Sequence, residues 1–268
     1  MSDMKRVVTI AGAAAQGSAG IQADLKTFQE RDVYGMAVIT ATVARHSKAT
    51  KGIYIRSIEE IEDQFYTIQE RVGFDAIKTG MLFSEEIIKK TVELIDSQST
   101  STLVVDPVMV GKMGSQLLQD SAITVLKNEL IPKATVITPN RLEASKLLDR
   151  EVIAEKSELI QAAIDLHKLG AKHVVLTGGV VGQEAIDVYY NGQESYVLRN
   201  EAIKTVNTSG AGCTFAACLT AELAKNTPVY EAVKISKDVV YQAIKHSLSF
   251  GEGVGSVRHG AYRQCNDG

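Results

Sequence analysis

The chain has 268 residues, of which 45% are hydrophobic and 23% charged, with a formal net charge of -3 and no tryptophan. This length allows one large α/β domain with a substantial core, and the lack of a basic stretch argues against a nucleic-acid partner. No segment resembles a signal peptide or a membrane span, so we expect a cytoplasmic protein without a membrane partner. Three cysteines without the paired spacing of a metal site predict reduced thiols.

Short runs rich in Val and Ile alternate with longer segments of helical periodicity, which is typical of a parallel sheet covered by helices on both faces. The expected strands are Arg6–Ala11, Met36–Val43, Ala76–Lys78, Thr102–Val105, Ala134–Thr138 and His173–Leu176. The expected helices are Gly20–Arg31, Ile58–Val72, Glu85–Asp96, Ile123–Glu129, Arg141–Leu148, Glu158–Leu169, Gly212–Ala224 and Tyr230–Phe250. Segments 186–190 and 195–198 flank Asn191-Gly192 and predict an antiparallel hairpin. No linker divides the chain, so we expect a single domain over residues 1–268.

A glycine-rich turn, residues 208–214, leads into an apolar helix near the C-terminus. Such a turn directs unpaired N–H groups and the positive end of the helix dipole at one spot, which suits a phosphate group. Cys213 lies at that spot, where a helix N-terminus lowers the pKa of a thiol and favours partial ionisation. This segment alone leaves a second interpretation equally open, in which Cys213 is a small residue packed at a helix start.

Ligands collect at the carboxyl ends of the strands in sheets of this kind, and the polar candidates of this chain follow strands. Asp106 and Glu143 follow successive strands and are candidates for a hydrated Mg²⁺, although each also suits a turn or a helix N-terminus. Asn140 is expected to cap a helix. Lys78 and Lys112 are candidates for a phosphate contact, with a solvated loop as the alternative for Lys112.

The first strand is followed by a loop of small residues, 12–20, which is able to lie close against a flat ligand. This loop carries neither the lysine of a P-loop nor the G-x-G-x-x-G pattern of a dinucleotide site. P-loop hydrolysis and hydride transfer are therefore disfavoured.

Together these segments resemble the vitamin-kinase branch of the ribokinase superfamily, which contains hydroxymethylpyrimidine/phosphomethylpyrimidine kinases and the pyridoxal kinases of Gram-positive bacteria. The matching residues are Thr9–Gly12, Gly20–Phe28, Lys78–Leu82, Asp106–Val110, Thr138–Asn140 with Glu143-Ala144, Gly178-Gly179 and Gly210–Thr214. They span almost the whole chain in the family's order, which makes the set far more specific than any single motif.

The resemblance implies a ribokinase-like three-layer α/β/α sandwich with a mostly parallel central sheet, usually dimeric. It also implies transfer of the γ-phosphoryl group of ATP to a hydroxymethyl group on a small heteroaromatic ring. The implied roles are an anion hole of Gly210, Ala211 and Gly212 with Cys213 beside the attacking hydroxyl, Mg²⁺ binding by Asp106 and Glu143, nucleotide binding by Asn140, Thr177, Gly178, Gly179 and Lys112, and ring binding by Gly12, Asp24, Met81 and Val108.

Departures from the family pattern bear on the choice of acceptor. Ala13–Ala15 replace polar residues of the first loop, Ser209 replaces a common histidine, and Gly111 stands where Gram-positive pyridoxal kinases tend to carry a cysteine. Thr79, Thr177–Gly179 and the tail His259–Tyr262 resemble the pyridoxal-type members, whereas Ile39–Ala41 and Lys112–Gly114 resemble the pyrimidine kinases. We favour a pyridoxal/pyridoxine kinase, with hydroxymethylpyrimidine as the alternative acceptor. A homologue that binds without turnover is a further alternative, disfavoured because such a protein would not require an intact Gly210–Cys213 turn.

Overall fold

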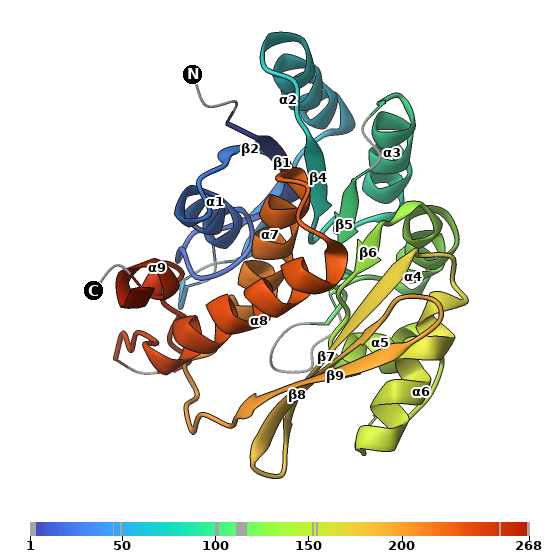
Figure 1. Cartoon of the computed structure of the whole chain (residues 1–268). Coiled ribbons are helices and arrows are strands. Elements are labelled where there is room, and N and C mark those ends of the chain that lie inside the picture. Colours follow the sequence, from blue (N-terminus) through green and yellow to red (C-terminus); the bar gives the residue numbers. More distant parts are fainter. Residues whose placement is uncertain are drawn as a thin grey trace.

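A nine-stranded sheet forms the centre of the molecule (Figure 1), in a computed structural model that describes residues 4–44, 46–48, 50–99, 102–110, 117–151, 153, 155–251 and 253–266. The strands are β1 (Arg6–Ala14), β2 (Tyr34–Val43), β3 (Ile53–Ile55), β4 (Ala76–Thr79), β5 (Leu103–Val105), β6 (Val136–Ile137), β7 (His173–Val181), β8 (Glu184–Tyr190) and β9 (Ser195–Glu201). Their order is β3-β2-β1-β4-β5-β6-β7-β8-β9. Strands β2 to β7 along this order pair in parallel, while β3, β8 and β9 are antiparallel to their neighbours, as the predicted hairpin requires.

Helices cover both faces of this sheet and give the three layers that were predicted. They are α1 (Ile21–Glu30), α2 (Ile58–Arg71), α3 (Glu85–Asp96), α4 (Asp120–Val125), α5 (Arg141–Leu147), α6 (Lys156–His167), α7 (Ala211–Ala224), α8 (Val229–Lys245) and α9 (Ala261–Asn266). Helices α1, α7, α8 and α9 lie on one side, and α2 to α6 lie on the other (Figure 1). Helix α7 packs directly on β4 and β5, which brings its N-terminus to the carboxyl ends of these strands.

The central strands bury side chains on both faces, because successive residues of a strand point in opposite directions. Val105 and Val174 pack in the core under α2 to α6, and their neighbours Val104 and Val175 pack in the core under α7 and α8. A strand buried on both faces needs apolar residues at consecutive positions, which explains the continuous Val and Ile runs of the sequence.

Strand β1 is longer than predicted and ends at Ala14 instead of Ala11. It stays paired with β2 as far as Ala14 opposite Val43, across an irregularity between Ala11 and Gly12. The predicted loop of small residues therefore begins later, and Gly12 is a strand residue at a bulge.

Strand β7 also runs past its predicted end at Leu176. It pairs with β8 up to Thr177 and again from Val180, so Gly178 and Gly179 form a bulge inside the strand. Gly178 fits there because an added Cβ would lie 2.4 Å from the carbonyl oxygen of Ile186.

Helical boundaries differ from the prediction near α4 and α8. The chain continues from α4 through a π-helical turn (Leu126–Leu130) and a short 3₁₀ turn (Ile131–Lys133). Helix α8 ends at Lys245, because the chain turns back and Leu248 pairs with Ser256 through N···O contacts of 2.7 and 2.9 Å. Strand β3 and helix α9, which have three and six residues, were not predicted because they are too short for a periodic pattern.

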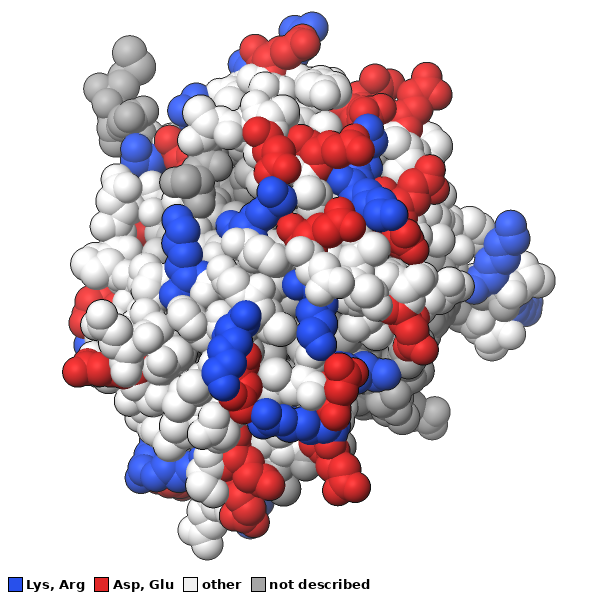
Figure 2. All heavy atoms as spheres, turned by 90° about the vertical axis from the view of Figure 1, so that its right-hand side faces the viewer, with Lys and Arg blue, Asp and Glu red and all other residues white. Residues whose placement is uncertain are grey.

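Positive and negative side chains are interspersed over the face shown in Figure 2. Ion pairs join Lys89 to Glu85 within α3 and Lys90 of α3 to Glu62 of α2. Over its described residues, this face presents no block of positive charge for nucleic-acid phosphates. No helix in the described part of the chain is both long and apolar enough to cross a membrane.

Candidate active site

The glycine turn before α7 has the free backbone N–H groups at a helix N-terminus that an anion site would need. Gly210 caps the helix with φ +87°, and a Cβ at this position would lie 1.8 Å from the carbonyl oxygen of Ser18, so that only glycine fits. Within the described part of the chain, the N–H groups of Gly212 and Cys213 have no acceptor. Two free donors at the positive end of a 14-residue helix can bind a phosphate oxygen.

Cys213 is a neutral thiol in this structure, and the prediction of a partly ionised thiol is wrong. Burial raises its pKa to about 12, with the carboxylates of Asp106 and Asp24 adding to the effect and Lys78 opposing it. The N–H of Gly20 donates to Sγ at 3.4 Å. Desolvation therefore outweighs the helix dipole at this thiol.

The raised pKa of Cys213 predicts slow alkylation. At pH 7.5 we expect iodoacetamide to modify the exposed Cys265 first, because only the thiolate reacts. The rate at Cys213 should then rise about tenfold per pH unit up to pH ~10, since the thiolate fraction grows in that proportion. Peptide mass spectrometry over a time course measures both rates, and equal rates at pH 7.5 would contradict this assignment.

Lys78 and Asp24 form an ion pair in the interior, so Lys78 is not the free phosphate ligand that the sequence suggested. Lys78 Nζ lies 3.0 Å from Asp24 Oδ2, and both side chains are 0% exposed. The hydroxyl of Thr9 donates to the same oxygen at 2.7 Å. Burial would lower the pKa of Lys78, but the carboxylates of Asp24 and Asp106 reverse this and raise it. Oδ1 of Asp24 is buried without a partner among the described residues.

Asp106 and Glu143 come together at the carboxyl ends of β5 and β6, as predicted. Both are buried, and burial raises both pKa values; the charge of Asp106 raises that of Glu143 further. The alternative role of Glu143 is also present, because its carboxylate accepts the N–H of Asn140 at 2.9 Å in a capping box. Asn140 Oδ1 in turn accepts the N–H of Glu143 at 3.0 Å, so the predicted helix cap is confirmed.

These two carboxylates suit a Mg²⁺ ion that keeps water ligands better than they suit an ion held by protein ligands alone. Two buried carboxylates, of which Asp106 raises the pKa of Glu143, form an oxygen donor set of the kind that Mg²⁺ prefers. Over the described residues there is no group of three or more His, Cys, Asp or Glu that could enclose a metal. The remaining ligands would have to be water or phosphate oxygens.

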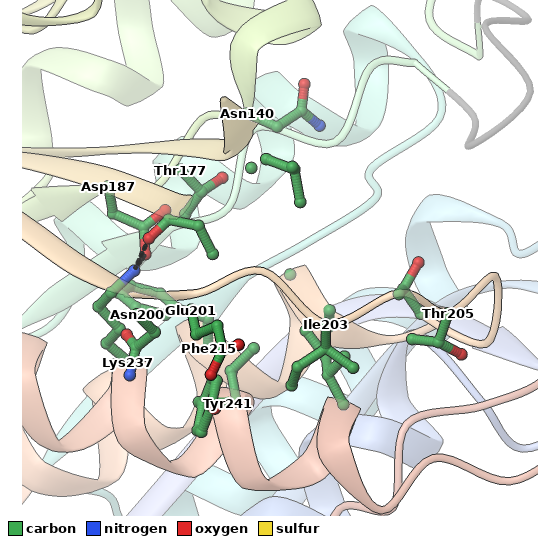
Figure 3. Close-up of a pocket in the computed structure, with 18 residues that line it drawn as sticks. Asn140, Thr177, Asp187, Asn200, Glu201, Ile203, Thr205, Phe215, Lys237 and Tyr241 are labelled. Atoms are coloured by element: carbon green, nitrogen blue, oxygen red, sulfur yellow. Dashed lines mark hydrogen bonds and ion pairs between the residues drawn. The ribbon is translucent and has the colours of Figure 1, made fainter. Parts of the chain in front are cut away.

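A cavity of about 440 Å³ lies beside the glycine turn and gathers most of the predicted nucleotide residues (Figure 3). Among its lining residues are Asn140 of α5, Thr177 and Gly179 of β7, Asp187 of β8, Asn200 of β9, Ala211 and Gly212 of α7, and Lys237 and Tyr241 of α8. Gly178 lies behind this wall, where its N–H donates to Asp187 Oδ1 at 3.1 Å. Lys112 lies outside the described residues, as does Gly111.

Sequence reasoning missed the ion pair that crosses this cavity wall. Lys237 Nζ lies 2.8 Å from Asp187 Oδ2 and 3.2 Å from the carbonyl oxygen of Ala185 (Figure 3). A signal was present, because Lys237 interrupts the apolar stripe that Val233 and Val240 form at helical spacing. Asp187 gave no comparable signal, since its partner comes from another element 50 residues away.

The predicted acceptor residues lie at the ends of β1, β4 and β5, which are neighbours in the sheet. A Cβ on Gly12 would lie 2.8 Å from the ring of Phe83, and the hydroxyl of Thr40 donates to the carbonyl oxygen of Met81 at 2.9 Å. Val108 follows β5 and is partly exposed, whereas Asp24 is fully buried. The fold therefore brings Gly12, Met81 and Val108 to one edge, with Asp24 beneath it.

Of the three alanines that replace the family's polar loop, Ala13 has a packing role. Ala13 is 6% exposed and packs with Ala11 and Ile21. The prediction that Ala13–Ala15 form a loop beside the acceptor is wrong for Ala13 and Ala14, which belong to β1. Ser209, in the position of a common histidine, lies with its hydroxyl 3.0 Å from that of Ser18.

A family model described as phosphomethylpyrimidine kinase matches residues 15–258 of the chain. The chain belongs to the phosphomethylpyrimidine kinase family. Within this family, a pyridoxine kinase of Bacillus subtilis is 42% identical over 264 residues, covering 97% of each chain. A hydroxymethylpyrimidine/phosphomethylpyrimidine kinase of Haemophilus influenzae is 41% identical over 267 residues, covering 98% of this chain and 99% of the relative.

Among solved structures, the pyridoxal kinase of Staphylococcus aureus in complex with AMP-PCP and pyridoxal superposes with a TM-score of 0.90 at 39% identity, covering 98% of this chain and 96% of that chain. The predicted ribokinase-like α/β fold and the predicted family are thus confirmed. Membership of the phosphomethylpyrimidine kinase family also supports the predicted enzyme class, a kinase with an alcohol as acceptor.

Proposed function

We propose that the chain is an ATP-dependent kinase that phosphorylates the hydroxymethyl group of pyridoxal or pyridoxine. One observation carries this proposal: Gly212 lines the nucleotide-side cavity, the adjacent Cys213 contacts Gly20 beside β1, and the N–H groups of both Gly212 and Cys213 are free. A phosphoryl group in transfer between a nucleotide and an alcohol needs positioning and charge stabilisation at this place. The pyridoxal kinase complex with AMP-PCP and pyridoxal supports both ligands.

On the nucleotide side, we assign ATP to the cavity of about 440 Å³. Apolar side chains of Ile203, Val240 and Ile244 offer a surface for the base, while Asn140 and Thr177 offer polar groups on the same cavity. Gly178 and Gly179 shape the wall, and Lys112 remains our candidate for a phosphate contact. The ADP and AMP-PCP complexes of pyridoxal kinases support a nucleotide in this fold.

We assign Mg²⁺ to Asp106 and Glu143, in contacts completed by water and phosphate oxygens. When bound, the ion would neutralise the charge that develops on the phosphates. The two carboxylates would orient the ion, and the N–H groups of Gly212 and Cys213 would hold the transferred phosphoryl group. Cys213 would lie beside the attacking hydroxyl, whose proton can leave late because the transition state is loose.

Replacement of Asp106 by Asn is expected to weaken the use of Mg·ATP without loss of stability. The Mg²⁺ concentration for half-maximal rate should rise roughly 10- to 100-fold, as for a lost partner in a metal shell. Stability should not fall, because the raised pKa of Asp106 indicates that its ionised form destabilises the folded protein. This destabilisation is present at every pH above the ordinary pKa of an aspartate, and Asn removes the charge that causes it. Magnesium titrations at saturating ATP, together with thermal unfolding, measure both effects.

Asp149→Asn is the matched control for this variant, because Asp149 has an 83% exposed side chain that pairs with Lys127 on the surface. We expect its Mg²⁺ dependence to equal that of the unchanged protein. An unchanged Mg²⁺ requirement in Asp106→Asn would remove Asp106 from the metal site.

On the acceptor side, we assign the ring to Gly12, Met81 and Val108, with Asp24 beneath. The unpartnered Oδ1 of Asp24 supports this assignment, since a buried carboxylate oxygen without a donor is rarely left so in a complete site. Hydroxymethylpyrimidine is the alternative acceptor, favoured by the 41% identity to a kinase of that substrate.

An assay of ATP-dependent phosphorylation with pyridoxal, pyridoxine and hydroxymethylpyrimidine tests the proposal. We expect the highest kcat/KM with a B6 vitamer. The highest value with hydroxymethylpyrimidine would select the alternative acceptor, and tight binding without turnover of any of the three would identify a binding homologue. A homodimer, a cytoplasmic location and a single domain over residues 1–268 complete the proposal, and the single sheet built from most of the chain supports the last of these.

A further inference from the structure

The C-terminal segment 255–259 runs along the glycine turn and is bonded to it. The N–H of Ser209 donates to the carbonyl oxygen of Gly255 at 3.2 Å, and the N–H of Val257 donates to that of Ser209 at 3.0 Å. Val257 and His259 are 0% and 7% exposed, so this segment is packed and not a loose tail. The turn that carries the free N–H groups therefore rests on residues about 45 positions further along the chain.

His259 makes the side-chain contact between this segment and the turn. Its Nδ1 lies 2.9 Å from Oγ1 of Thr214, and that hydroxyl lies 2.8 Å from the carbonyl oxygen of Gly210. The ring also packs against Gly210, where an added Cβ would lie 3.2 Å from Cε1. Ser18 and His259 thus both lie close to the position that a Cβ of residue 210 would occupy.

The hydrogens in this series of hydrogen bonds, from His259 through Thr214 to Gly210, can be placed by counting donors. The single hydrogen of Thr214 Oγ1 goes to the carbonyl oxygen of Gly210, so Nδ1 of His259 must be the donor to Oγ1. Nε2 is then a bare acceptor, and it is buried without a partner among the described residues. Burial, with the charge of Lys26, lowers the pKa of His259 to about 4, which keeps the ring neutral and this arrangement intact at neutral pH.

We propose that His259 is a positioning residue of the kinase reaction, which acts through Thr214 to fix the direction of the N–H groups and the thiol of the Gly210–Cys213 turn. It lines neither the nucleotide cavity nor the proposed acceptor edge, so we assign it no direct contact with either substrate. A small rotation of Gly210 would redirect both free N–H groups, and a displacement of about 1 Å at a reacting centre can lower a rate by ~100-fold. The kinetic part of this inference rests on the proposed function.

His259→Leu removes the donor at similar volume, and His259→Asn restores one, because the amide nitrogen of Asn can occupy the place of Nδ1. We expect His259→Leu to lower kcat about 10- to 100-fold with little change in either KM, and His259→Asn to recover most of the loss. Arg258→Leu, a change at the exposed neighbour, is the matched control and should leave kcat unchanged. Loss of kcat in His259→Leu without recovery in His259→Asn, or a kcat within about twofold of the unchanged protein, would overturn the proposal.

Amide hydrogen exchange of Ala211 and Thr214, whose N–H groups donate to the carbonyl oxygens of Thr208 and Gly210, gives a readout that does not depend on turnover. We expect exchange there to be at least ~10-fold faster in His259→Leu and unchanged in Arg258→Leu. If the unchanged protein phosphorylated none of the three acceptors, the proposed function would fail while exchange still decided the role of His259. If His259→Leu did not fold, Thr214→Val would break the same link and Thr214→Ser would keep it. Equal exchange in these two variants would contradict the proposal.

Discussion

Cys213→Ala is expected to lose most of the kcat of the enzyme while its stability stays near that of the unchanged protein. The thiol lies at the start of α7, beside the free N–H groups, where the attacking hydroxyl is proposed to bind. We expect the thiol to orient that hydroxyl, and a displacement of about 1 Å at a reacting centre can lower a rate by ~100-fold. In the fold, the thiol accepts one weak hydrogen bond from Gly20, so its removal should change the free energy of unfolding by less than about 1 kcal/mol.

Two further variants sharpen this prediction. Cys265→Ala makes the same change at an exposed cysteine of α9 and should leave kcat unchanged. Cys213→Ser keeps a hydrogen-bonding group, but a hydroxyl ionises far less readily than a thiol. Activity retained by Cys213→Ser would show that Cys213 orients the hydroxyl, and activity as low as that of Cys213→Ala would show that the reaction uses ionisation of the thiol. A near-normal rate in Cys213→Ala would remove Cys213 from the mechanism.

Much of the fold could be predicted because it depends on local patterns. Consecutive apolar residues such as Val104-Val105 identify a strand buried on both faces, and this holds wherever the strand lies in the sheet. The residue at which a strand ends depends on how far the neighbouring strand pairs with it. The small residues Gly12, Ala13 and Ala14 gave no local sign that β1 would continue, because that extension is created by pairing with β2 up to Val43.

The candidate site was predictable to the extent that its residues follow strands in the chain. Asp106 and Glu143 could be placed together because β5 and β6 are parallel neighbours. The pair of Asp187 and Lys237 could not, since it joins a hairpin to a distant helix. The thiol of Cys213 was misjudged for a similar reason: its burial beside Gly20 is a tertiary contact, and that burial reverses the effect of the helix dipole on its pKa.

Lys78→Met is expected to be the most destabilising single change at the site. It would leave the carboxylate of Asp24 buried without its cation, and it would also remove the positive charge that offsets Asp106. Breaking a fully buried pair in this way costs about 3–5 kcal/mol of unfolding free energy. Urea unfolding at pH 7.5 measures the loss. Lys89→Met, which breaks an exposed pair with Glu85 in α3, is the control and should cost no more than ~0.5 kcal/mol.

The double variant Lys78→Met/Asp24→Asn separates the pair from the two side chains. Asn keeps an acceptor for the hydroxyl of Thr9 and removes the buried charge, so the double variant should be more stable than Lys78→Met alone. A loss of less than about 1 kcal/mol in Lys78→Met, or the absence of any recovery in the double variant, would mean that the pair contributes little to the fold. Recovered stability without recovered turnover would instead assign the charges of Asp24 and Lys78 to the reaction, because the two side chains lie beneath the acceptor edge and close enough to Cys213 to change the pKa of its thiol.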